Sequence, residues 1–183
     1  MKILVTAVMA FVGSNLDDIF VLMVLFAQAA CPAQKRRIAA GQCLGMGILT
    51  LVSLLLSAGA GWLPEDLLRF MGLLPLGMGL YQLLRRDRES KEETIAGIGL
   101  WSTALLTMSN GADNLGIYIP LFAGGSWHEN LVIVLIFAAL TALWCYLGSC
   151  LGNLPLLAKV IRKYRNILVP ALLILLGVLI LVG

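Results

Sequence analysis

Residues 4–30 read LVTAVMAFVGSNLDDIFVLMVLFAQAA, an apolar run with two acids, Asp17 and Asp18, near its middle. A membrane-spanning helix needs about 20 predominantly apolar residues, so this run is long enough to cross a bilayer. The rest of the chain has the same character, because 60% of its 183 residues are hydrophobic and 13% are charged. A soluble domain is about half apolar and about a quarter charged. The sequence therefore predicts an integral membrane protein.

Six apolar segments follow one another along the chain. We expect helices at about residues 4–30, 38–60, 66–84, 95–123, 130–152 and 166–182. The predicted fold class is an all-α integral membrane protein with six transmembrane helices in a single domain that spans residues 1–183. The net charge of +3 is small and lies in short clusters, so the expected partner is the lipid bilayer and not nucleic acid.

Most of the basic residues collect in alternate loops, around residues 35–37, 85–93 and 159–165. Short cytoplasmic loops of membrane proteins carry an excess of lysine and arginine. These three loops are therefore predicted to be cytoplasmic, and both termini extracytoplasmic.

The two halves of the chain resemble each other around the acids. An offset of 96 residues lays residues 14–18 (SNLDD) on residues 110–114 (NGADN), and an offset of 95 lays Ser14-Asn15 on Ser109-Asn110. We expect a first repeat at about 1–84, a cytoplasmic linker at about 85–93 and a second repeat at about 94–183. Because each half holds three helices, equivalent helices cross in opposite directions, and such inverted repeats place a substrate site at their interface near the midplane.

Three acids lie near the middle of apolar segments: Asp17, Asp18 and Asp113. No lysine, arginine or histidine stands at a comparable depth to pair with them. Ionisable residues inside the membrane usually mark a substrate or proton path. The structural alternative is that the acids are protonated and hydrogen-bond between helices.

Two short motifs predict that the long helices 1 and 4 are broken at mid-membrane. Ser14-x-x-Asp17 and Asn110-x-x-Asp113 have the spacing of a helix N-cap followed by an acid at the third helical position. We expect the helices to restart at Ser14 and Asn110, and unwound carbonyls before each restart to face the site.

The resulting candidate metal site is rich in oxygen. Its predicted ligands are Asp17, Asp18, Asp113, Asn15, Asn110 and Asn114, with Ser14 and Ser109 in support. Such a donor set suits a hard or borderline dication such as Mn²⁺, Ca²⁺ or Cd²⁺. Three carboxylates around one dication leave one negative charge, which a proton could neutralise, so cation/proton exchange is a hypothesis.

Several motifs resemble those of the cadmium-resistance transporters of the CadD type, within the LysE superfamily of bacterial exporters. They are Asp17-Asp18, Gly41-Gln42 with Gly45, Gly72-Leu73-Leu74-Pro75, and Gly111-Ala112-Asp113-Asn114-Leu115-Gly116 with Pro120. The resemblance implies a multi-pass secondary transporter in the bacterial cytoplasmic (inner) membrane that exports Cd²⁺, built from two inverted three-helix repeats. It leaves a homo-oligomer open.

The cysteines show no metal-finger or redox spacing, and we interpret them mainly as apolar filler. Cadmium prefers thiolate whereas the acids offer oxygen. Cys43 is therefore a candidate supporting residue beside Gln42, which belongs to the family motif.

Other functions remain as alternatives. An amino-acid exporter of the same superfamily would need a counter-charge at its centre, and a membrane thiol-redox carrier would need cysteines where this chain has Asp17 and Asp113. A channel or a passive membrane subunit is a further reading. No soluble-type enzyme active site is visible in the sequence, so we expect no enzymatic activity and no cofactor. The sequence also holds no phosphate-binding loop, so we do not expect ATP hydrolysis.

Overall fold

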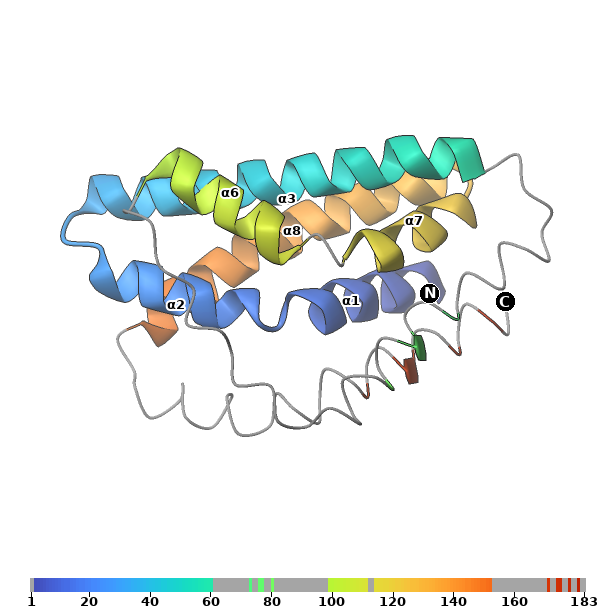
Figure 1. Ribbon diagram of the computed structural model, residues 1–183, viewed down its shortest axis with the longest axis horizontal. Coiled ribbons are helices and arrows are strands. Elements are labelled where there is room, and N and C mark those ends of the chain that lie inside the picture. The colour runs from blue at the N-terminus through green and yellow to red at the C-terminus, as the bar shows by residue number, and fades with distance from the viewer. Residues whose placement is uncertain are drawn as a thin grey trace.

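The computed structural model describes residues 2–60, 99–111 and 114–152, and single helical positions at 73, 76, 77, 80, 171, 174, 175, 178 and 181. Within these residues the structure is helical and contains no strand. The elements are α1 (Lys2–Asn15), α2 (Asp18–Gln28), α3 (Pro32–Ala60), α6 (Leu100–Asn110), α7 (Leu115–Ala123) and α8 (Trp127–Leu151) (Figure 1).

Several of the described helices have the length and composition of membrane spans. Two are long and apolar enough to cross a bilayer alone, over Pro32–Gly59 and Trp127–Leu151. The pair α1 and α2 passes the same test as one span bent by 60°. The predicted all-helical fold is thus confirmed for these segments, and their apolar spans are consistent with a membrane protein. The expected helices at 66–84 and 166–182 lie outside the described residues, apart from the single helical positions, and so do the loops at 85–93 and 159–165.

Helix α3 begins at Pro32, six residues before the start expected from the sequence. Proline favours the first helical position because its missing N–H would have no intrahelical partner there. Gln34 strengthens this start, since its Oε1 accepts a hydrogen bond from the backbone N–H of Ala30 (2.7 Å). The basic residues 35–37 therefore lie in the first turns of α3 and not in a loop, which corrects the predicted boundary.

Both predicted helix breaks are present. Helix α1 ends at Asn15 and α2 begins at Asp18, while α6 ends at Asn110 and α7 begins at Leu115. The expected restart positions were wrong, because Ser14 and Asn110 lie in the last turns of α1 and α6. Ser14 cannot act as an N-cap since its Oγ donates back to the carbonyl of Ala10 (2.8 Å). The N-cap of α2 is Asp17, and that of α7 is Asn114.

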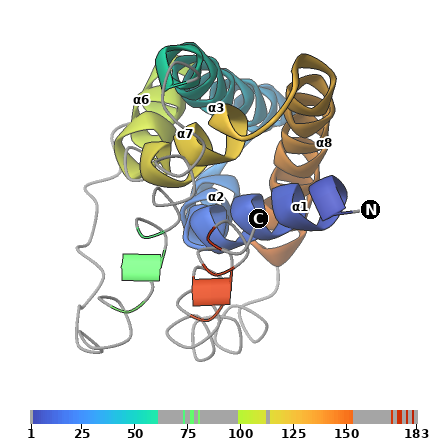
Figure 2. The same cartoon turned by 90° about the vertical axis from the view of Figure 1, so that its right-hand side faces the viewer.

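The broken helices run in opposite directions through the bundle. In Figure 1, the α1–α2 pair runs from right to left and the α6–α7 pair from left to right. The long helices α3 and α8 are also antiparallel to each other. Viewed along the bundle, α3 and α8 lie side by side, with α1–α2 and α6–α7 completing the ring (Figure 2).

Glycines at four-residue spacing allow two close helix contacts. A Cβ at Gly41 would lie 2.7 Å from Thr103 Cβ, and one at Gly45 would lie 2.7 Å from Thr107 Cβ, so α3 and α6 touch almost backbone to backbone. Gly148 of α8 meets α2 in the same way, with Leu22 Cβ 2.8 Å from the added carbon. Membrane helices associate through small residues because lipid provides no hydrophobic driving force between them.

Candidate functional site

The two helix breaks meet inside the bundle. Asn15, the last residue of α1, is fully buried, and Asn114, the N-cap of α7, is buried beside it. The Nδ2 atom of Asn114 donates a hydrogen bond to Oδ1 of Asn15 (3.3 Å). Two of the predicted ligands, 99 residues apart in sequence, are therefore in direct contact.

The orientation of the Asn15 amide follows from its neighbours. Its Nδ2 donates to the carbonyl oxygen of Phe11 (2.9 Å) and to the hydroxyl of Tyr118 (2.5 Å). A backbone carbonyl can only accept, so the amide nitrogen must face Phe11, and Oδ1 is left on the side of Asn114. The indole Nε1 of Trp144 donates to the Asn15 backbone carbonyl (2.8 Å), which would otherwise lack a partner at the end of α1.

Asp18 opens α2 and is buried, with 4% of its surface exposed. Its Oδ2 accepts a hydrogen bond from Nε2 of Gln42 on α3 (3.3 Å). The oxygen of the same Gln42 amide accepts from Oγ1 of Thr107 on α6 (2.5 Å). A chain of polar contacts thus joins α2, α3 and α6, and Gln42 holds the Asp18 carboxylate in place. The N-terminal position also favours a carboxylate through the helix dipole.

The remaining predicted ligands lie around these contacts. Asp17 is half-buried at the break, and its backbone carbonyl accepts from the N–H groups of Phe20 (3.0 Å) and Val21 (3.4 Å). Asn110 is half-buried at the end of α6. Asp113 lies outside the described residues. Within the described ranges, no three histidine, cysteine, aspartate or glutamate side chains come together as a metal-binding group.

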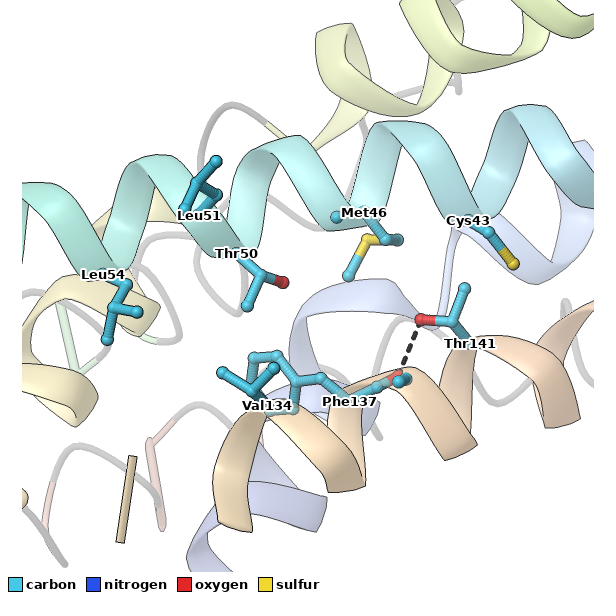
Figure 3. Close-up of a pocket in the computed structure, with 10 residues that line it drawn as sticks. Cys43, Met46, Thr50, Leu51, Leu54, Val134, Phe137 and Thr141 are labelled. Atoms are coloured by element: carbon cyan, nitrogen blue, oxygen red, sulfur yellow. Dashed lines mark hydrogen bonds between the residues drawn. The ribbon is translucent and has the colours of Figure 1, made fainter. Parts of the chain in front are cut away.

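The supporting residues separate into two groups. Ser14 belongs to the network, since its Oγ lies 2.9 Å from the Tyr118 hydroxyl, and so does Gln42. Ser109 is exposed on α6. Cys43 is also exposed and lines a cleft with residues of α8 (Figure 3).

The family model that describes cadmium resistance transporters matches residues 11–183, which is nearly the whole chain. The chain belongs to the cadmium resistance transporter family. The family resemblance drawn from the motifs is thereby confirmed. No curated protein and no solved structure matches the chain.

Sequence reasoning on this transporter-family member missed three residues that hold the site: Thr107, Tyr118 and Trp144. The sequence spacing could have predicted Tyr118 as a site residue, because it stands four residues after Asn114 and therefore on the same helix face. Thr107 repeats Thr103 at the same spacing, opposite the glycines of α3. No local sequence pattern predicts Trp144 as a site residue, since its contact with Asn15 joins residues 129 positions apart.

The side chains at this site in this family member provide oxygen atoms as possible ligands. A buried carboxylate and three buried side-chain amides lie at or next to the helix interruptions, where Asp18 contacts Gln42 and Asn15 contacts Asn114. Among the described residues, lysine and arginine occur only at positions 2 and 35–37, at helix ends. A buried carboxylate in hydrocarbon is costly without a counter-charge, and carboxylate and amide oxygens are the ligands that hard dications prefer. The site is therefore suited to a cation and not to an anion.

Proposed function

We propose that this member of the cadmium resistance transporter family is a secondary transporter that exports divalent heavy-metal cations, Cd²⁺ above all, across the bacterial cytoplasmic membrane. The observation that supports this most strongly is the buried contact between Asn15 and Asn114 (3.3 Å) at the two helix breaks, beside the buried Asp18. Broken helices at a repeat interface are where secondary transporters bind their substrates.

In this proposal the six helices form two inverted repeats with both termini outside. The opposite directions of the two broken helices support it, as do those of α3 and α8 (Figure 1). The break positions support it too. The first half-helices end at Asn15 and Asn110, which the offset of 95 aligns, whereas the second break is two residues longer.

The proposed ligands are the carboxylates of Asp17, Asp18 and Asp113 with the amides of Asn15, Asn110 and Asn114. Gln42 and Ser14 position them, through the contacts to Asp18 and to Tyr118. Three carboxylates would leave one negative charge on the complex with a dication, which one bound proton would neutralise, and two further protons taken up when the cation leaves would keep the site neutral. Exchange of the cation for protons follows from this charge count.

Substitution of the acids tests the proposal. We expect Asp18→Asn and Asp113→Asn to be expressed and thermally stable, because losing a charge in hydrocarbon does not harm insertion. Uptake of Cd²⁺ into everted vesicles should fall by at least about tenfold, since even residues that merely orient ligands contribute about 10–100-fold to metal affinity. The matched control is Glu129→Gln, an acid at the exposed start of α8 where glutamine can also cap the helix.

Two results would contradict the proposal. Normal Cd²⁺ uptake by a stable Asp113→Asn protein would remove that acid from the site and favour hydrogen bonding between helices as its role. Uptake that does not respond to an imposed pH gradient in the wild-type protein would contradict exchange with protons.

A further inference from the structure

A cleft of about 340 Å³ lies between α3 and α8, and the described residues that line it are all uncharged. Figure 3 shows the side chains of Met46 on α3 and Phe137 on α8 pointing into the space between the two helices. Both are buried, whereas Gly47, Leu51 and Ala138 on the rim are exposed. The cleft therefore has an apolar floor and opens at the surface of the bundle, where a membrane protein meets hydrocarbon.

The length of the cleft corresponds to one leaflet of a bilayer. Along α3 its lining runs from Cys43 to Leu54, a separation of 11 residues. At about 1.5 Å per residue, this separation covers roughly 16 Å of helix. The hydrocarbon core of a bilayer is about 30 Å thick, so one leaflet contributes about 15 Å. One acyl chain running along α3 would therefore match the cleft in length.

A basic cluster lies on α3 beyond one end of the cleft. It consists of Lys35, Arg36 and Arg37 in the first turns of the helix, and both arginines are exposed. Arg36 stands seven residues before Cys43 and 18 residues before Leu54. These separations are close to two and five whole helical turns, so Arg36 lies on the same face of α3 as the cleft.

The path from Arg36 to the cleft is lined by small residues on α3, since positions 39 and 40 are alanines and Ala40 is exposed. The acids within the described ranges lie elsewhere. Asp17 and Asp18 are at the first helix break, and Glu129 is at the start of α8, the end that lies far from the start of α3 (Figure 1). The positive charge of Arg36 is thus available to a ligand that extends into the cleft.

We propose that the cleft between α3 and α8 binds an anionic phospholipid from the leaflet in which α3 begins. The phosphate contacts Arg36, and one acyl chain passes the two alanines and lies in the cleft. Basic residues at the membrane end of a helix attract anionic lipids, and the apolar cleft adds a place for the chain. This inference does not depend on transport of a cation, because lipid binding is measured on the purified protein.

The test is native mass spectrometry of the purified, delipidated protein in detergent. The probes are phosphatidylglycerol and phosphatidylcholine with identical oleoyl chains. We expect wild type to bind phosphatidylglycerol at least about fivefold more tightly, which is the contribution of one basic residue near an anionic membrane surface. Arg36→Gln should lose most of this preference. Arg37→Gln is the matched control, because it removes the same charge from an exposed side chain that points about 100° away from Arg36, and it should keep most of the preference.

A second pair of variants tests the position of the acyl chain. Gly47→Leu should fill the cleft and displace bound phosphatidylglycerol, and nothing lies within 4 Å of a Cβ added at Gly47. Gly59→Leu is the matched control on the same helix. Its added Cβ also meets nothing within 4 Å, and it does not line the cleft, so its lipid binding should equal that of wild type. Ala138→Leu fills the cleft from α8 and replaces Gly47→Leu if thermal unfolding without lipid shows that protein to be unfolded.

Four results would overturn the proposal. Equal binding of the two lipids by wild type would exclude recognition of the charge. Equal losses in Arg36→Gln and Arg37→Gln would show a general attraction between basic residues and lipid head groups. Unchanged phosphatidylglycerol binding in the folded cleft-filling variants would place the chain elsewhere. A lipid-free dimer that Gly47→Leu dissociates would show that a second copy of the chain fills the cleft.

Discussion

Asn15 takes part, through its side chain and its backbone, in hydrogen bonds with two other helices. Its amide contacts Asn114 and Tyr118 of α7, and its backbone carbonyl accepts from Trp144 of α8. At the scale of single residues, the end of α1 is therefore fixed by partners from distant parts of the sequence. The Trp144 ring adds packing, with its centroid 5.3 Å from that of Phe11.

Replacing Trp144 by phenylalanine should separate these two contributions. The aromatic contact with Phe11 is largely kept, whereas the Asn15 carbonyl loses its donor in a buried position. An unsatisfied buried polar group costs about 1–3 kcal/mol, so we expect a clearly lower melting temperature in detergent. The control is Trp101→Phe, whose side chain is 72% exposed, and its effect should stay within about 0.5 kcal/mol. Equal effects of the two substitutions would show that the indole hydrogen bond does not stabilise the break.

At the scale of elements, the site depends on how closely α3 approaches α6. Gly41 and Gly45 flank Gln42 on α3 and meet α6 without side chains of their own. Close approach is what allows Gln42 to contact Thr107 on one side and Asp18 on the other. The motif Gly41-Gln42 with Gly45 thus combines a packing surface with a polar side chain that it positions.

Gly45→Ala should therefore destabilise the protein. The added Cβ would lie 2.7 Å from Thr107 Cβ and 2.9 Å from the Ala104 carbonyl oxygen, so the helices must move apart. Overpacking of this kind costs about 1–3 kcal/mol.

Gly47→Ala is the matched control on the same helix, because nothing lies within 4 Å of its added Cβ. There we expect no loss, and a gain of up to about 1 kcal/mol from helix propensity. Thermal unfolding of both variants makes the comparison, and an unchanged Gly45→Ala protein would contradict the close α3–α6 contact.

At the scale of the whole molecule, the opposite directions of the broken helices agree with an arrangement of two inverted repeats (Figure 1). The exposed side chains are suited to contact with lipid, since α3, α6 and α8 present large apolar residues outward, among them Leu55, Leu105 and Leu135. The orientation of this bundle in the membrane is the part that only the distribution of positive charge predicts.

Labelling of introduced cysteines tests that orientation. In a protein without the native cysteines, Ser90→Cys should react from the cytoplasmic side, because it lies in the basic loop at 85–93. Ser126→Cys should react from outside, since Ser126 is exposed just before α8 and is separated from that loop by α6 and α7, which the proposal treats as one broken span. Membrane-impermeant maleimide applied to right-side-out and everted vesicles makes the measurement. Reaction of both positions from the same side would rule out the three-plus-three arrangement.

The sequence by itself determined the class of the protein, the broken helices and the family. Apolar runs of membrane length and a low content of charge are local properties, so composition predicts them directly. The acids at Asp17 and Asp18, and the polar residues around 110–114, marked the two interruptions. The restart positions were misplaced because the Ser14 hydroxyl bonds back to Ala10, a choice between two local partners that spacing does not decide.

Only the tertiary structure decided which polar groups meet. The spacing pointed to Asn110 and Asn114 equally, yet it is Asn114 that contacts Asn15, because the second break is longer and α7 starts at Leu115. Likewise Gln42 contacts Asp18 while its neighbour Cys43 lines a cleft with residues of α8, since adjacent residues of a helix point about 100° apart and face different partners. Sequence patterns encode the face of a helix, whereas the partner of that face depends on how distant helices pack.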